Sequence, residues 1–303
     1  MPESTKEPSN RSTRLGEYKS ELIIGYPPHP FSPFDFHAPF SHVPTRIWMD
    51  DYGDTTSEPG TMRVLFLFEP NAVTHVANTI CKDPNRWDYI LAHNRRVLLR
   101  CPNAVRFLHG TTWIGDYASP PKEFGVSLLV THVNCTNGHN LRRKIWNRRD
   151  EIKIPKRCFV NDLVQDVKSE GYKLGDSKDP LFDTQFHFAI ENCRTKNYFT
   201  EKLIDCFQTR TVPIYYGAKN VRRWFNTRGM IIVRDVEEAI AACNSLTPNT
   251  YESMKDAIED NYRRSLDWLD MNPRLQSVIS ELSLLWPKRR RFGYLSRRWR
   301  DLH

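Results

Sequence analysis

The feature that most constrains the fold is a repeated alternation of short apolar runs with amphipathic stretches. Short apolar runs bounded by turn signals are typical of buried strands, and the stretches between them have room for helices. Strands are expected at 46–50, 62–68, 87–92, 105–108, 125–133, 185–190, 211–216 and 230–233. Helices are expected at 71–82, 140–149, 200–207, 219–225, 236–242, 251–269 and 273–285. This alternation predicts an α/β protein whose parallel sheets carry helices on both faces.

A proline-rich segment divides the alternation into two series. Ser119-Pro120-Pro121-Lys122 disfavours both helix and strand and therefore reads as a linker. The predicted organisation is an irregular arm, two Rossmann-like domains and a basic aromatic tail, at 1–45, 46–121, 122–286 and 287–303. Ligands of open α/β sheets bind beyond the carboxyl ends of the strands, so the expected site is a cleft between the two sheets.

Several functional classes find no support in the sequence. Neither a GxGxxG nor a GxxxxGK[ST] motif occurs, so a dinucleotide cofactor and a P-loop are not expected. The seven cysteines are scattered, odd in number and without a CxxC pair, which argues against a disulfide framework and a structural zinc. No apolar run reaches the ~18 residues of a membrane span, and the polar N-terminus lacks a signal-peptide pattern. The expected protein is cytoplasmic, either soluble or peripherally associated with a membrane.

The positive charge of the chain is concentrated at its C-terminus. The net charge is +8, and residues 287–303 carry seven Lys/Arg against one Asp, which gives +6. Since only +2 remains for the rest of the chain, a nucleic-acid partner is not expected. The basic residues of the tail flank Phe292, Tyr294 and Trp299. This composition suits contact with an anionic membrane surface, and it equally suits a solvated helix end.

The segment 186–217 carries most of the functional information. A buried strand ends at Glu191 and Asn192, and a polar loop leads to Thr200, which can cap the next helix. Lys202 lies in the first turn of that helix. The free N–H groups of a helix N-terminus, together with a lysine, form a natural site for a diphosphate.

Three further side chains belong to the same candidate site. Glu201 can accept hydrogen bonds from a ribose diol. Tyr216 and Gly217 end the following strand, where a glycine permits close approach of a ligand. Because strand residues alternate between faces, only one of Tyr215 and Tyr216 can face the site, and both can instead fill the core.

This segment resembles the donor-binding signature of glycosyltransferase family 10, the α-1,3/1,4-fucosyltransferases. The shared pattern is a hydrophobic strand, E-N, a short gap, Y-[FIV]-T-E-K, a helix, T-[VI]-P-[IV] and a loop with Gly. The matching positions are Glu191, Asn192, Tyr198, Phe199, Thr200, Glu201, Lys202, Thr211, Val212, Pro213, Ile214 and Gly217. The resemblance covers roughly residues 124–235. It implies a GT-B fold, in which two Rossmann-like domains face a central cleft, with the donor site in the second domain and the acceptor site in the first.

The resemblance also implies how the leaving group is stabilised. In the family, an arginine at the start of the helix after the first donor-domain strand contacts the donor phosphates; Arg142 is the best match and Arg143 the alternative. No D-x-D motif occurs, so we expect no metal ion and no cofactor besides the nucleotide sugar. Arg142, Lys202 and the helix N-terminus would then stabilise the departing diphosphate. Plainer interpretations exist, since Arg142 lies in a basic stretch that solvent could cover and Tyr198 could be a core aromatic.

An inverting transferase needs a carboxylate that deprotonates the acceptor hydroxyl. Glu69 is the candidate, because it follows the strand at 62–68 and precedes Pro70, where the family carries a Glu near a Pro. Asp88 and His93 are alternatives. A carboxylate at the start of a helix is also favoured by the helix dipole alone, without any catalytic role.

The expected function is inverting, metal-independent transfer of a sugar to a hydroxyl of an acceptor oligosaccharide or glycoprotein glycan. GDP-fucose is the expected donor, with UDP-xylose or another nucleotide sugar as the alternative. A non-catalytic GT-B protein that binds glycans or membranes is the competing class. The chain resembles the family but shows no membrane anchor, and this combination favours a bacterial or viral enzyme.

Overall fold

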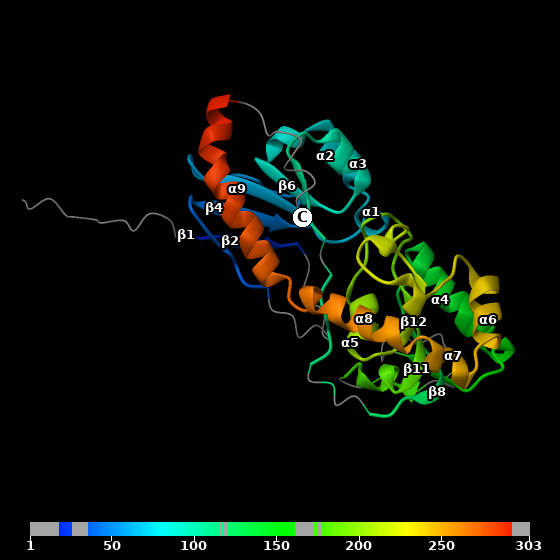
Figure 1. Cartoon of the computed structure of the whole chain (residues 1–303). Coiled ribbons are helices and arrows are strands. Elements are labelled where there is room, and N and C mark those ends of the chain that lie inside the picture. The colour runs from blue at the N-terminus through cyan, green and yellow to red at the C-terminus, as the bar shows by residue number, and fades with distance from the viewer. Residues whose placement is uncertain are drawn as a thin grey trace, which may run out of the picture.

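The computed structural model describes residues 18–25, 36–108, 110–115, 117, 120–160, 172–174 and 177–292. These residues form two lobes, each built on one parallel β-sheet (Figure 1). The helices of the described ranges include none that combines the length and the apolar character needed to cross a bilayer.

The first lobe contains a five-stranded sheet in the order β2-β4-β5-β6-β7, and every neighbouring pair is parallel. Its strands are β2 (Glu21–Ile24), β4 (Thr45–Met49), β5 (Met62–Leu67), β6 (Tyr89–Ala92) and β7 (Ala104–Arg106). One face packs against α2 (Ala77–Lys82) and α3 (Arg95–Arg100) through a cluster that includes Trp48, Leu65 and Ile80.

The other face of this sheet is covered by α9 (Asn272–Phe292), the last helix of the chain. Leu275 and Ile279 of α9 are fully buried in one cluster with Ile47 and Phe66 of the sheet. Figure 1 shows α9, in orange, alongside the blue strands of the first lobe. The prediction that 122–286 forms one domain is therefore wrong at its C-terminal end. The periodicity of a helix indicates that one face is buried, but it does not tell which sheet covers that face.

The predicted irregular arm over 1–45 also needs correction. Residues 21–24 form the edge strand β2, and β1 (Tyr18–Lys19) pairs antiparallel with β3 (Phe40–Ser41). The apolar run that forms β2 is too short to stand out by periodicity, and the parallel partner β4 stabilises it. At the other end, residues 287–292 of the predicted tail continue α9, and 293–303 lie outside the described residues. Membrane contact by the tail stays a prediction.

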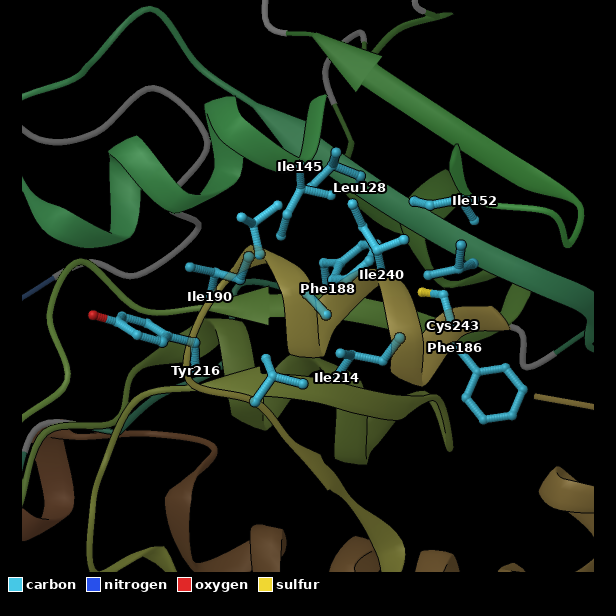
Figure 2. Packing of buried hydrophobic residues seen from close by; sticks show 14 of the residues in the cluster. Leu128, Ile145, Ile152, Phe186, Phe188, Ile190, Ile214, Tyr216, Ile240 and Cys243 are labelled. Atoms are coloured by element: carbon cyan, nitrogen blue, oxygen red, sulfur yellow. The ribbon is translucent and has the colours of Figure 1, made fainter. Parts of the chain in front are cut away.

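The second lobe contains a six-stranded parallel sheet in the order β10-β9-β8-β11-β12-β13. Its strands are β8 (Glu123–Val130), β9 (Lys156–Val160), β10 (Tyr172–Lys173), β11 (Thr184–Ile190), β12 (Val212–Tyr216) and β13 (Ile231–Ile232). The helices that cover it are α4 (Asn137–Asn147), α5 (Glu201–Gln208), α6 (Val236–Asn244), α7 (Pro248–Ser253) and α8 (Lys255–Ser265). Alternate residues of β11 face one layer, and Figure 2 shows Phe186, Phe188 and Ile190 among the apolar side chains of α4 and α6. The strands β9 and β10 were not predicted.

Two other predicted helices differ locally. The helix expected at 71–82 is divided into α1 (Asn71–Thr74) and α2, because His75 adopts a left-handed conformation with φ 57°. The helix expected at 219–225 is a single 3₁₀ turn, Val221–Arg223. The helix α3, which Asn94 caps by accepting the N–H groups of Arg96 and Val97, was not predicted.

The chain passes between the lobes twice, and the two passages contact each other. The N–H of Thr112 donates to the carbonyl oxygen of Leu269 at 3.2 Å. The Arg274 guanidinium donates to the carbonyl oxygens of Leu108 and Gly110. These bonds hold the two passages together where the chain crosses between the lobes.

Candidate functional site

The buried carboxylate of Glu191 holds the N-terminus of α5 in place. Glu191 is 0% exposed, and it accepts the Thr200 N–H at 2.8 Å and the Thr200 hydroxyl at 2.7 Å. The Thr200 hydroxyl oxygen accepts the Lys202 N–H in turn and so caps the helix. Gly217 leaves room for this carboxylate, because a Cβ there would lie 2.6 Å from Glu191 Cγ. The structure thus gives Glu191 and Gly217 a bracing role beneath the helix terminus.

Burial raises the pKa of Glu191 from 4.5 to about 7. The folded protein therefore binds a proton more tightly than the unfolded chain does, and stability is lost as the pH rises toward and through 7. Relative to Glu191→Gln, the unsubstituted protein should lose up to about 3 kcal/mol of unfolding free energy between about pH 5 and about pH 8. Urea unfolding of both proteins at the two pH values measures this, and an equal difference at both would contradict it.

The helix α4 docks directly onto the loop that follows β11. The Gly138 N–H donates to the carbonyl oxygen of Asn192 at 3.1 Å. A Cβ on Gly138 would lie 1.8 Å from the Glu191 carbonyl oxygen, so only glycine permits this approach. The docking brings Arg142, in the second turn of α4, to the Asn192 side chain, where Nη2 donates to Oδ1 at 2.8 Å. The alternative candidate Arg143 instead donates to a backbone carbonyl that precedes the helix.

The guanidinium group of Arg142 retains unused hydrogen-bonding capacity. The residue is 7% exposed, and its Nε has no hydrogen-bond partner. Burial lowers the pKa of Arg142, but an arginine stays protonated in proteins. A buried guanidinium with a free donor is suited to binding an anion. Arg142 is therefore not part of a solvated basic face, which was the plainer interpretation of its position.

Glu201 and Lys202 form an ion pair at the head of α5. Lys202 Nζ lies 2.8 Å from Glu201 Oε1, and a second ammonium group, that of Lys178, lies 3.6 Å from the same oxygen. Although burial opposes it, these two cations hold the pKa of Glu201 well below its usual range. Burial alone would lower the pKa of Lys202, but the Glu201 and Glu191 carboxylates raise it. Both groups are therefore charged at neutral pH.

Tyr198 lies where the two lobes meet. It is 1% exposed, and its ring is 5.2 Å from the His93 ring of the first lobe, measured between centroids. The neighbouring Asn197 donates to the His93 carbonyl oxygen at 3.4 Å. The core-aromatic interpretation of Tyr198 agrees with this position. His93 is a poor base, because burial lowers its pKa to about 4.

Asp88 lies away from these residues, so the prediction of Asp88 as an alternative general base is wrong. It precedes β6 and therefore lies at the amino end of the sheet, where its Oδ2 accepts the Arg63 N–H at 2.8 Å. A cavity at that end is lined by the loop 55–61, Arg63 and Asp88. Glu69 and His93 lie at the carboxyl ends of the strands of the first lobe, which is the opposite edge of the sheet.

Glu69 belongs to the first lobe and lies near enough to Lys202 and Glu201 of the second lobe for their charges to act on it. It follows β5, and burial raises its pKa, while the charge of Lys202 lowers it and that of Glu201 raises it. Its backbone N–H donates to Asp50 Oδ2 at 2.6 Å. Asp50 also accepts the N–H of Phe68 at 3.1 Å and the Tyr52 hydroxyl at 2.9 Å. Glu69 thus lies on a peptide that a second carboxylate holds in place.

Three side chains of the site were not identified from the sequence: Asp50, Lys178 and Asp205. Asp50 has a left-handed backbone with φ 49°, and burial raises its pKa to about 7. It was the last residue of a predicted strand, and an acidic residue where an apolar strand ends is a signal that could have indicated it. Lys178 and Asp205 gave no signal beyond their charge.

The tyrosines that end β12 lie on opposite faces, as the alternation predicted. The Tyr215 hydroxyl accepts the Ala218 N–H at 2.8 Å within the core. Tyr216 is 8% exposed, and Figure 2 shows it at the margin of the apolar cluster with its hydroxyl pointing away from it. Of the two, Tyr216 is therefore the one whose hydroxyl can meet a ligand.

Taken together, the second lobe presents two cations and a capped helix N-terminus, and the first lobe presents a carboxylate across from them. The cations and the positive end of the α5 helix dipole suit a diphosphate. The carboxylate, whose pKa is raised by burial, suits proton removal from a hydroxyl group. Of the predicted residues, Arg142, Asn192, Glu201, Lys202 and Glu69 are brought together, while Glu191, Thr200 and Gly217 support them.

Comparison with known proteins gives one family match and several similar folds. A family model described as "Glycosyltransferase family 10 (fucosyltransferase) C-term" matches residues 121–275, which is 155 of 303 residues. The alpha-(1,3)-fucosyltransferase FucT of Helicobacter pylori is 34% identical over 65 residues, which is 22% of this chain and 14% of that protein. This chain therefore aligns with a small part of that relative's length.

Among solved structures, TarM has a TM-score of 0.51 at 11% identity, covering 79% of this chain and 54% of its own. An alpha1,3-fucosyltransferase with GDP has a TM-score of 0.49 at 13% identity, covering 88% of this chain and 92% of its own. At such identities the likeness to TarM concerns the fold alone.

Proposed function

This chain belongs to glycosyltransferase family 10, and we propose that it transfers a sugar from a nucleotide-sugar donor, expected to be GDP-fucose, to a hydroxyl of an acceptor glycan. The family match and the two-sheet architecture confirm the resemblance of the segment 186–217 and the GT-B fold. The observation that carries the proposal is the meeting of Arg142, Lys202 and the α5 N-terminus opposite Glu69.

The donor diphosphate would bind at the head of α5. Lys202 and the unused Nε of Arg142 supply charge-assisted hydrogen bonds, and the first-turn N–H groups of α5 add the positive end of the helix dipole. Fixed cations of this kind stabilise the charge that develops on a departing diphosphate. They support the proposal that transfer needs no divalent ion. Glu201, held in place by its ammonium partners, would accept hydrogen bonds from the ribose.

On the opposite wall, Glu69 would deprotonate the acceptor hydroxyl as it attacks the sugar. Attack from the face opposite the leaving diphosphate inverts the anomeric centre. A carboxylate whose pKa is raised above its ordinary value is a more effective base than an ordinary one. The acceptor, an oligosaccharide or glycoprotein glycan, would therefore enter from the side of the first lobe.

A panel of donors tests the proposal. We expect GDP-fucose to be turned over and to release GDP, with UDP-xylose inactive, and the rate to be unchanged by EDTA. Turnover of UDP-xylose alone would contradict the fucose donor, and loss of activity in EDTA that Mn²⁺ restores would contradict the metal-free mechanism. Binding of a glycan without turnover of any donor would favour a non-catalytic protein.

A further inference from the structure

Lys178 is a buried cation beside the candidate donor site. Its side chain is 10% exposed, and its ammonium group lies 3.6 Å from Glu201 Oε1 and 3.4 Å from Asp205 Oδ2. The same ammonium lies 4.1 Å from the centroid of the Trp113 ring. Since Glu201 and Asp205 are one helical turn apart on α5, a single lysine neutralises the inner face of that helix.

Two ammonium groups therefore share one carboxylate oxygen. Lys202 approaches Glu201 Oε1 to 2.8 Å and Lys178 approaches it to 3.6 Å. Lys202 is the more exposed of the two, at 26% of its side chain against 10% for Lys178, and so Lys202 is the one with access to a ligand. To give its charge fully to a diphosphate, Lys202 would turn from Glu201 toward the ligand, and a buried carboxylate left without any cation is strongly destabilised.

We propose that Lys178 is the resident counter-ion of Glu201, a positioning residue that frees Lys202 to turn from Glu201 to the diphosphate of the donor. When Lys202 leaves, the shared Oε1 keeps an ammonium partner at 3.6 Å. Glu201 then stays charged and in place for the ribose. The inference rests on the proposed donor site and adds a residue that does not itself touch the donor.

The surroundings of Lys178 keep it in this position. Asp205 is buried, and its other oxygen, Oδ1, accepts the Thr112 hydroxyl and the Trp113 N–H, each at 2.8 Å. Thr112 and Trp113 belong to the segment that passes between the lobes. The indole face of Trp113 covers the ammonium group and attracts it through a cation–π interaction. Lys178 thus has fixed partners on two sides and remains beside Glu201 after Lys202 departs.

The test is the affinity for GDP, measured by titration calorimetry. Lys178→Met should weaken GDP binding by about tenfold to a hundredfold, because Lys202 must then stay with Glu201. Lys178→Arg should bind within a few-fold of the unsubstituted protein. The matched control is Lys122→Met, since Lys122 is also partly buried over an aromatic ring, 4.7 Å from the Tyr117 centroid, but contacts no acidic side chain of α5. We expect the control to bind GDP normally.

A second pair of variants separates this role from a general loss of structure. In a Glu201→Gln background the carboxylate that holds Lys202 is gone, so adding Lys178→Met should change the GDP affinity less than about twofold. An equal loss in both backgrounds, or normal GDP binding by Lys178→Met, would overturn the inference while leaving the proposed function intact. Absence of GDP binding by the unsubstituted protein would overturn the proposed function and this inference with it.

Discussion

Replacing Lys202 with methionine should lower the rate of sugar transfer by about a thousandfold or more. The Glu201 and Glu191 carboxylates raise the pKa of Lys202 against the opposing effect of its burial, so it carries its charge at neutral pH. Methionine keeps the apolar stem and removes the ammonium group that would stabilise the departing diphosphate. The affinity for GDP should fall as well, because the same interaction is made with the product. Single-turnover transfer and calorimetry with GDP measure the two effects.

Two controls make this expectation specific. Lys153→Met removes an exposed lysine that precedes β9 in the second lobe, and this variant should transfer sugar normally. The unfolding temperature of Lys202→Met should stay close to that of the unsubstituted protein, because Lys178 remains to pair with Glu201. Transfer by Lys202→Met at a rate within tenfold of normal would mean that the diphosphate is stabilised elsewhere.

The donor side of the site could be predicted because its residues are contiguous in sequence. Thr200, Glu201 and Lys202 occupy the cap and first turn of one helix, so the local rules of capping place them together. Glu191 directly follows β11, and the parallel pairing of β11 with β12 brings it beside Gly217. The structure gives a physical reason for the glycine at position 217 that was not predicted. This glycine accommodates Glu191 and the Tyr215 ring, and the approach of a ligand to Gly217 stays a prediction.

The side chains that support this site could not be predicted, because tertiary packing alone brings them there. Lys178 precedes β11 in a polar stretch and reaches α5 only in the folded protein. Asp50 and Glu69 are 19 residues apart, and the parallel pairing of β4 with β5 brings their strand ends together. Sequence periodicity describes which face of an element is buried, but the partner across that face depends on the whole topology.

The same reasoning explains the corrections to the fold. The expected helix at 273–285 exists as part of α9, yet it completes the first lobe rather than the second. The helices between the strands of the first lobe cover only one face of its sheet, so the opposite face needs a helix from elsewhere in the chain. The second passage between the lobes, near Leu269, follows from this requirement.

Glu69→Gln should lose transfer by about a thousandfold while it keeps its affinity for GDP. The amide has the size of the carboxylate and leaves the backbone N–H bond to Asp50 in place, so the local structure should persist. A glutamine cannot accept the proton of the acceptor hydroxyl. Calorimetry with GDP and the rate of GDP-fucose turnover with acceptor measure the two quantities. Asp88→Asn, at the opposite edge of the sheet, is the matched control and should transfer sugar normally.

The comparison of Glu69→Gln with Lys202→Met decides the role of Glu69. A carboxylate that merely favours the start of a helix would change stability by about 1 kcal/mol or less and leave the rate unaltered. If the carboxylate only oriented the donor, its loss would weaken GDP binding, as is expected of Lys202→Met. Loss of transfer with normal GDP affinity agrees with neither role and is expected only for a base acting on the acceptor. A near-normal rate in Glu69→Gln would assign the proton to another group of the first lobe, and because His93 is buried and neutral, Asp50 would be the next carboxylate to test.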